Sequence, residues 1–196
     1  NHPGIDDIYV VCVEGWEQML RVYAKQFGIT KLSNIIHGGT NGQDSIRNGV
    51  EAIAEKYNDD DIVLIHDAIR PMVSSDIISD NIRVCSQYGT AISVVPCTAA
   101  MLKTYDGETT TQQVPRDNLK TTQTPQAVTL GKLKWAHKEA LARGITNSVA
   151  TCTMFIELGQ ELHFSLGSEK NLKLTTPEDL EIFKALYNSK KDGWIK

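Results

Sequence analysis

A short aliphatic run at residues 62–65 leads into the acidic residue Asp67, and Arg70 follows three positions later. The run is typical of a buried strand, and in open α/β sheets ligands bind at the carboxyl ends of the strands. A carboxylate at that place is suited to hold Mg²⁺ on a triphosphate, so Asp67 is a candidate metal ligand. The alternative is a structural pair between Asp67 and Arg70 that shapes the turn. We expect His66 to be a half-buried structural histidine rather than a base.

A second candidate site is the glycine-rich turn at residues 38–42, which leads directly into a predicted helix. Glycines at the N-terminus of a helix let the backbone approach an anion or a nucleobase closely. The pattern is neither the G-x-G-x-x-G motif nor a Walker A motif. Gly38, Gly39 and Ser45 therefore fit two interpretations, a ligand-binding turn or a plain flexible turn capped by Ser45.

A third candidate is Lys173, which stands just before a clear helix start. Thr176 is a capping residue, Pro177 suits the first turn, and two acidic residues follow. A lysine at this place is suited to neutralise the charge that develops on a phosphoryl group during transfer. The other interpretation is a solvated lysine beside a well-formed helix start.

Short β-rich runs alternate with stretches of helical period, which predicts βα units around a largely parallel sheet. The predicted strands are residues 8–13, 62–65, 91–95 and 162–166. Apolar residues that recur at helical spacing are expected to be core: Trp16, Met19, Leu20, Tyr23 and Phe27, then Ile46, Val50 and Ile53, then Ile78, Ile82 and Cys85. The predicted fold is one α/β domain, residues 1–196, with a Rossmann-like, mostly parallel sheet flanked by helices.

Residues 97–123 interrupt this alternation. They are polar and rich in threonine, and Asp106-Gly107 is typical of a turn between two strands. We expect a β-hairpin arm here that projects from the main sheet and serves as a dimer arm or a lid. Gln123-Thr124-Pro125-Gln126, which closes the region, is too polar for a core.

The overall composition argues against several classes of protein. With 20 Lys and Arg against 24 Asp and Glu, the net charge is −4, and no basic run is long enough to follow a nucleic acid or bind an anionic membrane. The four cysteines show neither C-x-x-C pairs nor metal-ligand spacing, which is typical of reduced thiols. The apolar runs are too short to cross a bilayer, so we expect a cytoplasmic protein.

Four segments, in this order and spacing, resemble the 2-C-methyl-D-erythritol 4-phosphate cytidylyltransferase family and its relatives, the ribitol-5-phosphate cytidylyltransferases. The segments are Gly38-Gly39 through Ser45, His66-Asp67-Ala68 with Arg70-Pro71, Gln123-Thr124-Pro125-Gln126, and Asn171-Leu172-Lys173 with Thr175-Thr176-Pro177-Glu178-Asp179-Leu180. The match extends over nearly the whole chain. It implies a Mg²⁺-dependent homodimer with interlocking arms, which joins CTP to a small polyol phosphate and releases pyrophosphate.

The resemblance also implies roles for single residues. Asp67 and Lys173 would be catalytic, with Asp67 at Mg²⁺ and the nucleotide phosphates and Lys173 at the phosphates. The binding residues would be Gly38, Gly39, Ser45, Asp67 and Ala68 at the nucleotide, and Arg70 and Thr175 at the polyol phosphate. No covalent intermediate is required, so positioning and charge neutralisation would provide the catalysis.

Departures from the family bear on activity and on the second substrate. The family opens with a strand and a glycine-rich loop that cradle the triphosphate, and nothing before Asn1 supplies them, so we expect this chain by itself to be inactive. Ala99-Ala100 and Ala150 replace polar residues of the family, and Gly42 replaces an arginine. These replacements fall partly on the polyol-phosphate side of the site.

Three functions are compatible with this sequence. The main prediction is transfer of CMP from CTP to 2-C-methyl-D-erythritol 4-phosphate, a step of isoprenoid biosynthesis. The first alternative is the same chemistry on ribitol 5-phosphate or another pentitol phosphate. The second, from another class, is an inactive relative that binds nucleotide or serves as a dimerising scaffold.

Overall fold

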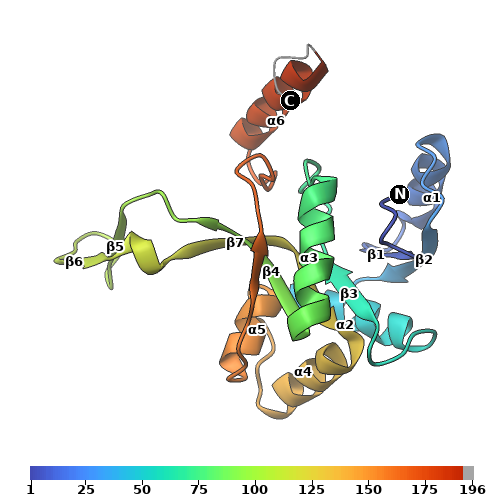
Figure 1. The fold of residues 1–196 in the computed structure, drawn as a ribbon, viewed down its shortest axis with the longest axis horizontal. Coiled ribbons are helices and arrows are strands. Elements are labelled where there is room, and N and C mark those ends of the chain that lie inside the picture. Colours follow the sequence, from blue (N-terminus) through green and yellow to red (C-terminus); the bar gives the residue numbers. More distant parts are fainter. Residues whose placement is uncertain (192–196) are drawn as a thin grey trace.

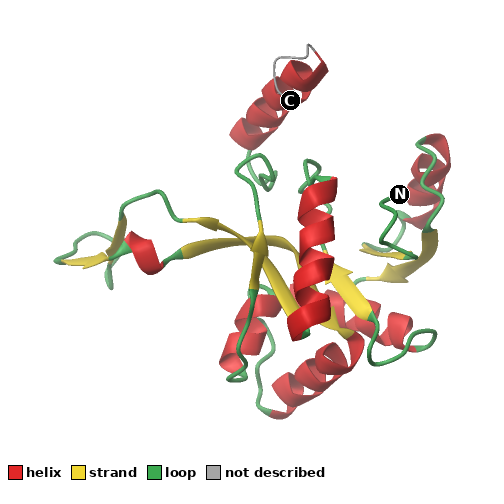
Figure 2. Ribbon diagram, in the orientation of Figure 1, coloured by secondary structure: helices red, strands yellow, loops and turns green. Residues whose placement is uncertain are grey.

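The computed structural model of the protein describes residues 1–191, shown by sequence position in Figure 1 and by secondary structure in Figure 2. The strands are β1 (Ile8–Cys12), β2 (Leu32–His37), β3 (Ile62–Ile65), β4 (Thr90–Pro96), β5 (Met101–Lys103), β6 (Gln112–Val114), β7 (Lys120–Thr129) and β8 (Phe164–Leu166). The α-helices are α1 (Glu17–Gln26), α2 (Gly42–Ala54), α3 (Ser75–Tyr88), α4 (Leu130–Ala142), α5 (Thr151–Glu157) and α6 (Pro177–Lys191).

The main sheet has the strand order β3-β7-β4-β8. β4 and β8 are parallel, whereas β7 runs antiparallel to both β3 and β4. β1 and β2 form a separate parallel pair. The predicted α/β fold with flanking helices is confirmed, and the four predicted strands correspond to β1, β3, β4 and β8. β7 was not predicted, because its buried residues include Gln123, Thr124 and Gln126 and so lack the apolar pattern of a central strand.

Each face of the main sheet has its own core, because successive side chains of a strand point to opposite faces. Val63 and Val128 belong to the core that α2, α4 and α5 cover. Ala127, next to Val128 in β7, belongs to the core on the other face, where it packs with Cys85 of α3. Figure 1 shows α3 apart from α4 and α5 accordingly. Burial of each aliphatic side chain contributes about 1.5–3 kcal/mol.

The apolar stripe of α1 is not core, which corrects the expectation from its helical spacing. Trp16 and Phe27 are 58% and 68% exposed, and no residue of α1 is buried. The physical reason is that no described element covers this face of α1, which connects β1 to β2. The stripes of α2 and α3 do reach the core, since Val50 and Cys85 are buried.

The hairpin arm consists of β5 and β6, which pair antiparallel, and it projects from the main sheet (Figure 1). The carboxylate of Asp106 orders its turn by accepting hydrogen bonds from the backbone nitrogens of Glu108 and Thr109. Residues 120–122 of the expected span 97–123 pair with β4 as part of β7. The arm therefore ends before Lys120.

α6 begins at Pro177, as its capping pattern predicts. The Thr176 hydroxyl accepts from the backbone nitrogen of Asp179 at 3.2 Å, and Asp179 Oδ2 accepts from that of Thr176 at 2.8 Å. These reciprocal bonds satisfy backbone donors at the helix start. Among the described helices, none combines the length and the apolar character that crossing a membrane would require.

Candidate active site

The carboxylate of Asp67 lies just beyond the carboxyl end of β3, in contact with two cations. Arg70 Nε donates to Asp67 Oδ2 at 3.3 Å, and Lys173 Nζ lies 3.2 Å from the same oxygen. The backbone nitrogen of Asp67 donates to Thr124 Oγ1 at 3.0 Å. The site therefore joins the turn after β3, the middle of β7 and the stretch before α6. The structural pair of Asp67 with Arg70 is present, and Lys173 joins it.

The two cations differ in their surroundings. The Arg70 side chain is 11% exposed, and its Nη1 donates to the carbonyl of Asn171 at 2.7 Å. The backbone nitrogen of Leu174 donates to the carbonyl of Ile69 at 2.8 Å, beside this bond. Arg70 thus fastens the stretch before α6 to the turn after β3. Lys173 is 44% exposed, so its ammonium group is accessible to a ligand.

His66 completes the hydrogen bonds around the turn. Its Nδ1 lies 3.1 Å from Thr124 Oγ1 and its Nε2 lies 3.2 Å from the carbonyl oxygen of Arg70. The carbonyl of Arg70 can only accept, so a neutral His66 donates from Nε2, and its Nδ1 then accepts from the hydroxyl of Thr124. The ring is more exposed than the expected half-buried position, but desolvation by the surrounding protein still lowers the pKa of His66. His66 acts structurally here, as expected.

Asn171 and Gln123 hold the site together, although sequence reasoning assigned them no role. The fully buried Asn171 donates from Nδ2 to the carbonyl of Thr124 at 2.9 Å and to Gln123 Oε1 at 3.2 Å. Gln123 in turn bonds both the carbonyl and the backbone nitrogen of Ser168. The bond between Thr124 and Pro125 is cis. The sequence feature that could have indicated this network is the polar run at residues 123–126. Its composition argued against an apolar core, but it is compatible with a buried network of hydrogen bonds.

The glycine-rich turn lies at the carboxyl end of β2. The backbone nitrogen of Gly38 donates to the carbonyl of Cys12 at 2.9 Å, and that of Gly39 donates to Ser45 Oγ at 3.0 Å. A Cβ atom on Gly39 would lie 2.3 Å from Cβ of Asp44, so only glycine fits there. Both amides are used within the protein, and the turn therefore offers an incoming ligand close approach and carbonyl oxygens.

The N-cap of α2 is Asn41, which corrects the interpretation of Ser45 as the cap. Asn41 Oδ1 accepts from the backbone nitrogen of Asp44 at 2.9 Å. Ser45 instead lies inside the first turn of the helix, where its hydroxyl donates to the carbonyl of Asn41 at 2.8 Å. Ser45 therefore links the glycine turn to the helix start.

Ala68 and Thr175 lie close in sequence to the contacts of Asp67. Both are exposed. The backbone nitrogen and the hydroxyl of Thr175 each donate to Asp179 Oδ2 at 2.9 Å. No hydrogen bond or ion pair among the described residues joins the glycine turn to the Asp67 cluster. The two groups are related through α2, which starts at the turn and packs against the core that contains Ile65 of β3.

This site offers a metal ion one carboxylate, that of Asp67, rather than a complete set of protein ligands. No group of three or more His, Cys, Asp or Glu among the described residues is placed to hold a metal ion. Both cations that contact Asp67 do so at Oδ2. Mg²⁺ commonly uses one or two carboxylates and takes its other ligands from phosphates and water. The residues present thus fit Mg²⁺ that arrives with a nucleotide.

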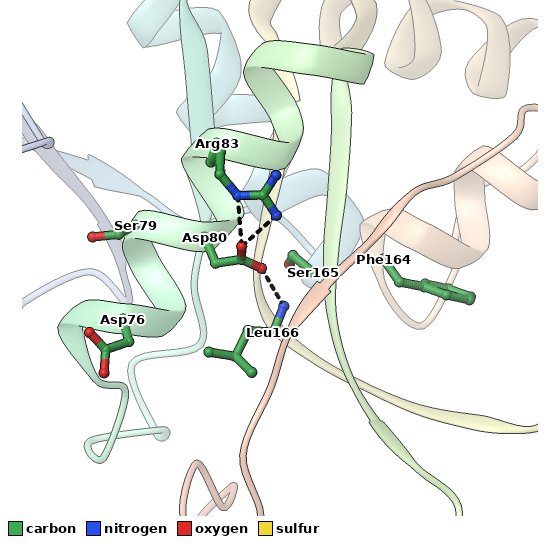
Figure 3. A pocket seen from close by; sticks show the side chains of 7 residues that line it. All are labelled: Asp76, Ser79, Asp80, Arg83, Phe164, Ser165 and Leu166. Atoms are coloured by element: carbon green, nitrogen blue, oxygen red, sulfur yellow. Dashed lines mark hydrogen bonds and ion pairs between the residues drawn. The ribbon is translucent and has the colours of Figure 1, made fainter.

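A larger hollow of about 570 Å³ lies between α3 and β8, away from these residues (Figure 3). Asp80 there is held by Arg83 and by the backbone nitrogen of Leu166, at 2.7 Å in each case. Asp76 adds a second carboxylate to the lining. The two carboxylates against one guanidinium leave this hollow with a net negative charge, which disfavours an anionic ligand.

Comparison with known proteins identifies the family of this chain. The family of 2-C-methyl-D-erythritol 4-phosphate cytidylyltransferases (IspD) matches residues 1–189. The chain belongs to this family. The protein is thus a cytidylyltransferase, an enzyme of the nucleotidyltransferase class, and the resemblance seen in its sequence is confirmed.

Two relatives and one solved structure illustrate the match. This cytidylyltransferase is 40% identical, over 97% of its length and 82% of the relative, to a ribitol-5-phosphate cytidylyltransferase of Lacticaseibacillus paracasei. It is 34% identical, over 95% of its length and 79% of the relative, to a 2-C-methyl-D-erythritol 4-phosphate cytidylyltransferase of Geotalea uraniireducens. A crystal structure of 4-diphosphocytidyl-2C-methyl-D-erythritol synthase superposes with a TM-score of 0.80 at 25% identity, covering 95% of this chain and 83% of that one.

Proposed function

We propose that this cytidylyltransferase transfers CMP from CTP to ribitol 5-phosphate. The observation that carries this choice is the 40% identity to the ribitol-5-phosphate enzyme of Lacticaseibacillus paracasei over nearly the whole chain. The main expectation from sequence, 2-C-methyl-D-erythritol 4-phosphate, becomes the second candidate. It is supported by the lower identity of 34% to the Geotalea uraniireducens enzyme.

The chemistry is one displacement at phosphorus. A phosphate oxygen of the polyol phosphate attacks the α-phosphorus of CTP, and a new P–O bond forms. The bond from the α-phosphorus to the oxygen that bridges it to the β-phosphorus breaks, and pyrophosphate leaves with that electron pair. Negative charge develops on the phosphate oxygens during this step, so a fixed cation lowers its barrier.

We propose Lys173 for that cation, because its ammonium group is accessible and Asp67 holds it in place at 3.2 Å. Asp67 would also be the ligand of Mg²⁺, which when bound would neutralise charge on the triphosphate. Since Arg70 and Lys173 both contact Oδ2 of Asp67, the other carboxylate oxygen of Asp67 is our candidate ligand of the metal. Asp67 and Lys173 are thus the proposed catalytic residues.

The glycine turn is our candidate for recognition of cytosine. The amides of Gly38 and Gly39 are already bonded inside the protein, so the groups they can offer are carbonyl oxygens. The exocyclic amino group of cytosine is a donor that such carbonyls can accept, whereas uracil presents an acceptor there. Ser45 would hold the shape of the turn, and Ala68 would leave room for the nucleotide beside Asp67.

For the polyol phosphate we propose Arg70, which bonds the carbonyl of Asn171 in the stretch that carries Lys173, and Thr175, which follows Lys173 in the same stretch. Further proposals concern assembly and location. The exposed arm of β5 and β6 would clasp a second copy of the chain in a homodimer. The four cysteines are all free, which suits a reducing cytoplasm, and the acidic chain would use neither nucleic acid nor membrane as a partner.

The test is release of pyrophosphate by the full-length protein with Mg²⁺ and ribitol 5-phosphate, supplied in turn with CTP, UTP, ATP and GTP. We expect rapid release with CTP and at least about tenfold less with UTP, which corresponds to about 1.4 kcal/mol for the missing amino donor. Equal rates with CTP and UTP would contradict the proposed role of the glycine turn. The CTP reaction is repeated with 2-C-methyl-D-erythritol 4-phosphate, and no release with either polyol phosphate would favour the inactive relative.

A further inference from the structure

A small cavity lies behind the glycine turn, between α2, α4 and α5. Its lining residues are Gln43, Ile46, His137, Ser148, Ala150, Thr151 and Met154. The space open to the centre of a water molecule is about 10 Å³. That is about the room that one water molecule needs. The cavity is thus far too small for a nucleotide or a sugar phosphate.

Two buried polar atoms of this lining have no hydrogen-bond partner. They are Nε2 of His137 on α4 and Oγ1 of Thr151, the first residue of α5. Both residues are only 4% exposed, so bulk water does not reach them. Buried polar atoms in folded proteins nearly always have a partner, either in the protein or in an ordered water. Two unpartnered atoms in the lining of one cavity of this size indicate a shared small ligand.

The other two polar side chains of the lining already have partners. The hydroxyl of Ser148 donates to Glu157 Oε1 at 3.2 Å. Gln43 Nε2 donates to the carbonyl of Ile145 at 2.7 Å, and Gln43 Oε1 accepts from the backbone nitrogen of Ser148 at 2.8 Å. The ligand must therefore satisfy one imidazole nitrogen and one hydroxyl, in a space that admits a single heavy atom. No carboxylate lines the cavity, which argues against a metal ion.

We propose that this cavity binds one water molecule, which hydrogen-bonds to His137 Nε2 and to Thr151 Oγ1. The water joins α4 to the start of α5 beside the loop of residues 145–150, of which Ser148 and Ala150 line the cavity. Gln43 bonds this loop at Ile145 and Ser148, and Asn41, the cap of α2, also donates to the carbonyl of Thr146 at 3.1 Å. The water thus helps to fix the loop against the helix start that carries the glycine turn.

The test is a crystal structure of the full-length protein at a resolution that shows ordered water, with Thr151→Val and Thr129→Val as variants. Thr151→Val keeps the shape of the side chain and removes the hydroxyl. Thr129 is the matched control, because it is the partly buried N-cap of α4 and makes no side-chain cap bond. We expect one water within hydrogen-bond distance of both atoms in the wild type and in Thr129→Val, and its loss in Thr151→Val.

An empty cavity in the wild type, a direct bond between His137 and Thr151, or an ion in place of water would overturn the proposal. If Thr151→Val does not fold, nuclear magnetic resonance of the wild-type protein still tests whether a water occupies the cavity. A long-lived water should then show cross-relaxation with the methyl group of Thr151, and absence of that signal would also count against the site. Neither measurement depends on which substrate the enzyme uses.

Discussion

One oxygen of Asp67 serves two cations whose tasks differ. Arg70 is nearly buried and bonds a backbone carbonyl as well, so it stabilises the turn, whereas Lys173 is accessible. A carboxylate in this position orients Lys173 without enclosing it. The two interpretations of Asp67 and Arg70 that the sequence left open are therefore compatible, since a structural pair can also hold a cation in place for a phosphate.

Replacing either catalytic candidate should reduce turnover far more than stability. We expect Lys173→Ala and Asp67→Asn to slow pyrophosphate release by about 10²–10³, the usual cost of losing one electrostatic contact to a transition state. Lys173→Ala should change stability by less than about 1 kcal/mol, since the pair is partly exposed. Lys170→Ala, which removes an exposed lysine close by, is the control and should keep normal turnover. Turnover of Lys173→Ala within a few-fold of normal would make Lys173 a surface residue only.

Removing Arg70, unlike removing Lys173, should have a large effect on stability in addition to any effect on the polyol phosphate. Arg70→Ala leaves the carbonyl of Asn171 and the carboxylate of Asp67 without a buried donor, so we expect a loss of roughly 2–3 kcal/mol in the free energy of unfolding. Arg83→Ala is the matched control, because its ion pair with Asp80 is well exposed and should contribute less than about 1 kcal/mol. Urea titrations of both variants measure the difference. Equal losses would mean that Arg70 does not fasten the site.

The sequence revealed the charged residues of the site but not the residues that support them. Asp67 and Arg70 follow a strand and Lys173 precedes a helix. Charged side chains at such ends are recognisable candidates for ligand binding. Asn171 and Gln123 are uncharged, and their bonds join positions 48 and 45 residues apart. Such long-range pairs leave no periodic signal in a single sequence, so only the structure could show them.

At the scale of elements, the glycine turn and α2 form one unit. A Cβ atom added to Gly39 would collide with Asp44, whereas one added to Gly42 would meet no atom within 4 Å. We expect Gly39→Ala to weaken CTP binding at least about tenfold, because the added carbon displaces the turn. Gly42→Ala should leave binding unchanged and, since alanine favours helices, stabilise by up to about 1 kcal/mol. Calorimetry with CTP measures both variants, and unchanged binding by Gly39→Ala would remove the turn from the nucleotide site.

The packing of α4 predicts a pH dependence of stability. Burial lowers the pKa of His137 from 6.5 to about 4, assisted by the charge of Arg47 and opposed by that of Asp44. The folded protein therefore binds fewer protons than the unfolded chain between these values, and stability is lost as the pH falls. The shift corresponds to roughly 3 kcal/mol between pH 7 and pH 4.

His137→Gln removes this titration, so its free energy of unfolding should fall less than that of the wild type over the same range. His66, whose pKa is also lowered, titrates in both proteins and cancels in the comparison. Urea titrations at pH 7, 5 and 4 provide the two slopes. Parallel slopes would show that His137 is not held neutral by burial.

Elements were predictable where their hydrophobic pattern matched their burial. The strands β3 and β4 have this property, and α6 has a clear capping pattern. In β8 the apolar Phe164 and Leu166 are exposed and Ser165 is buried, so its apolar residues marked the strand without marking its buried face. β7 could not be predicted in this way, because several of its buried side chains are polar and hydrogen-bonded rather than apolar. For α1 the apolar stripe predicted burial, but its side chains are exposed because no described element packs against them.

At the scale of the whole molecule, the described strands form separate sheets. β1 and β3 are each the last strand of their sheet within the described residues. The N-terminal strand and glycine-rich loop expected from the family stay a prediction. Sequence patterns assign elements one at a time, so this arrangement became visible only in three dimensions.

The arm is the other feature of the whole molecule. Leu102 and Tyr105 are 64% and 80% exposed on it, although apolar and aromatic side chains of this size usually find cover. A second copy of the chain would provide that cover in the proposed homodimer. The sequence predicted the hairpin from its turn, and its contacts with a partner stay a prediction.

The choice of substrate is tested most directly by competition in one vessel. The full-length protein is given CTP, Mg²⁺ and equal amounts of ribitol 5-phosphate and 2-C-methyl-D-erythritol 4-phosphate, and the two cytidine diphosphate products are quantified by mass spectrometry. Because both substrates compete for the same enzyme, the product ratio equals the ratio of their kcat/KM values at equal concentrations. We predict at least about tenfold more of the ribitol product. An excess of the methylerythritol product would contradict the proposed function.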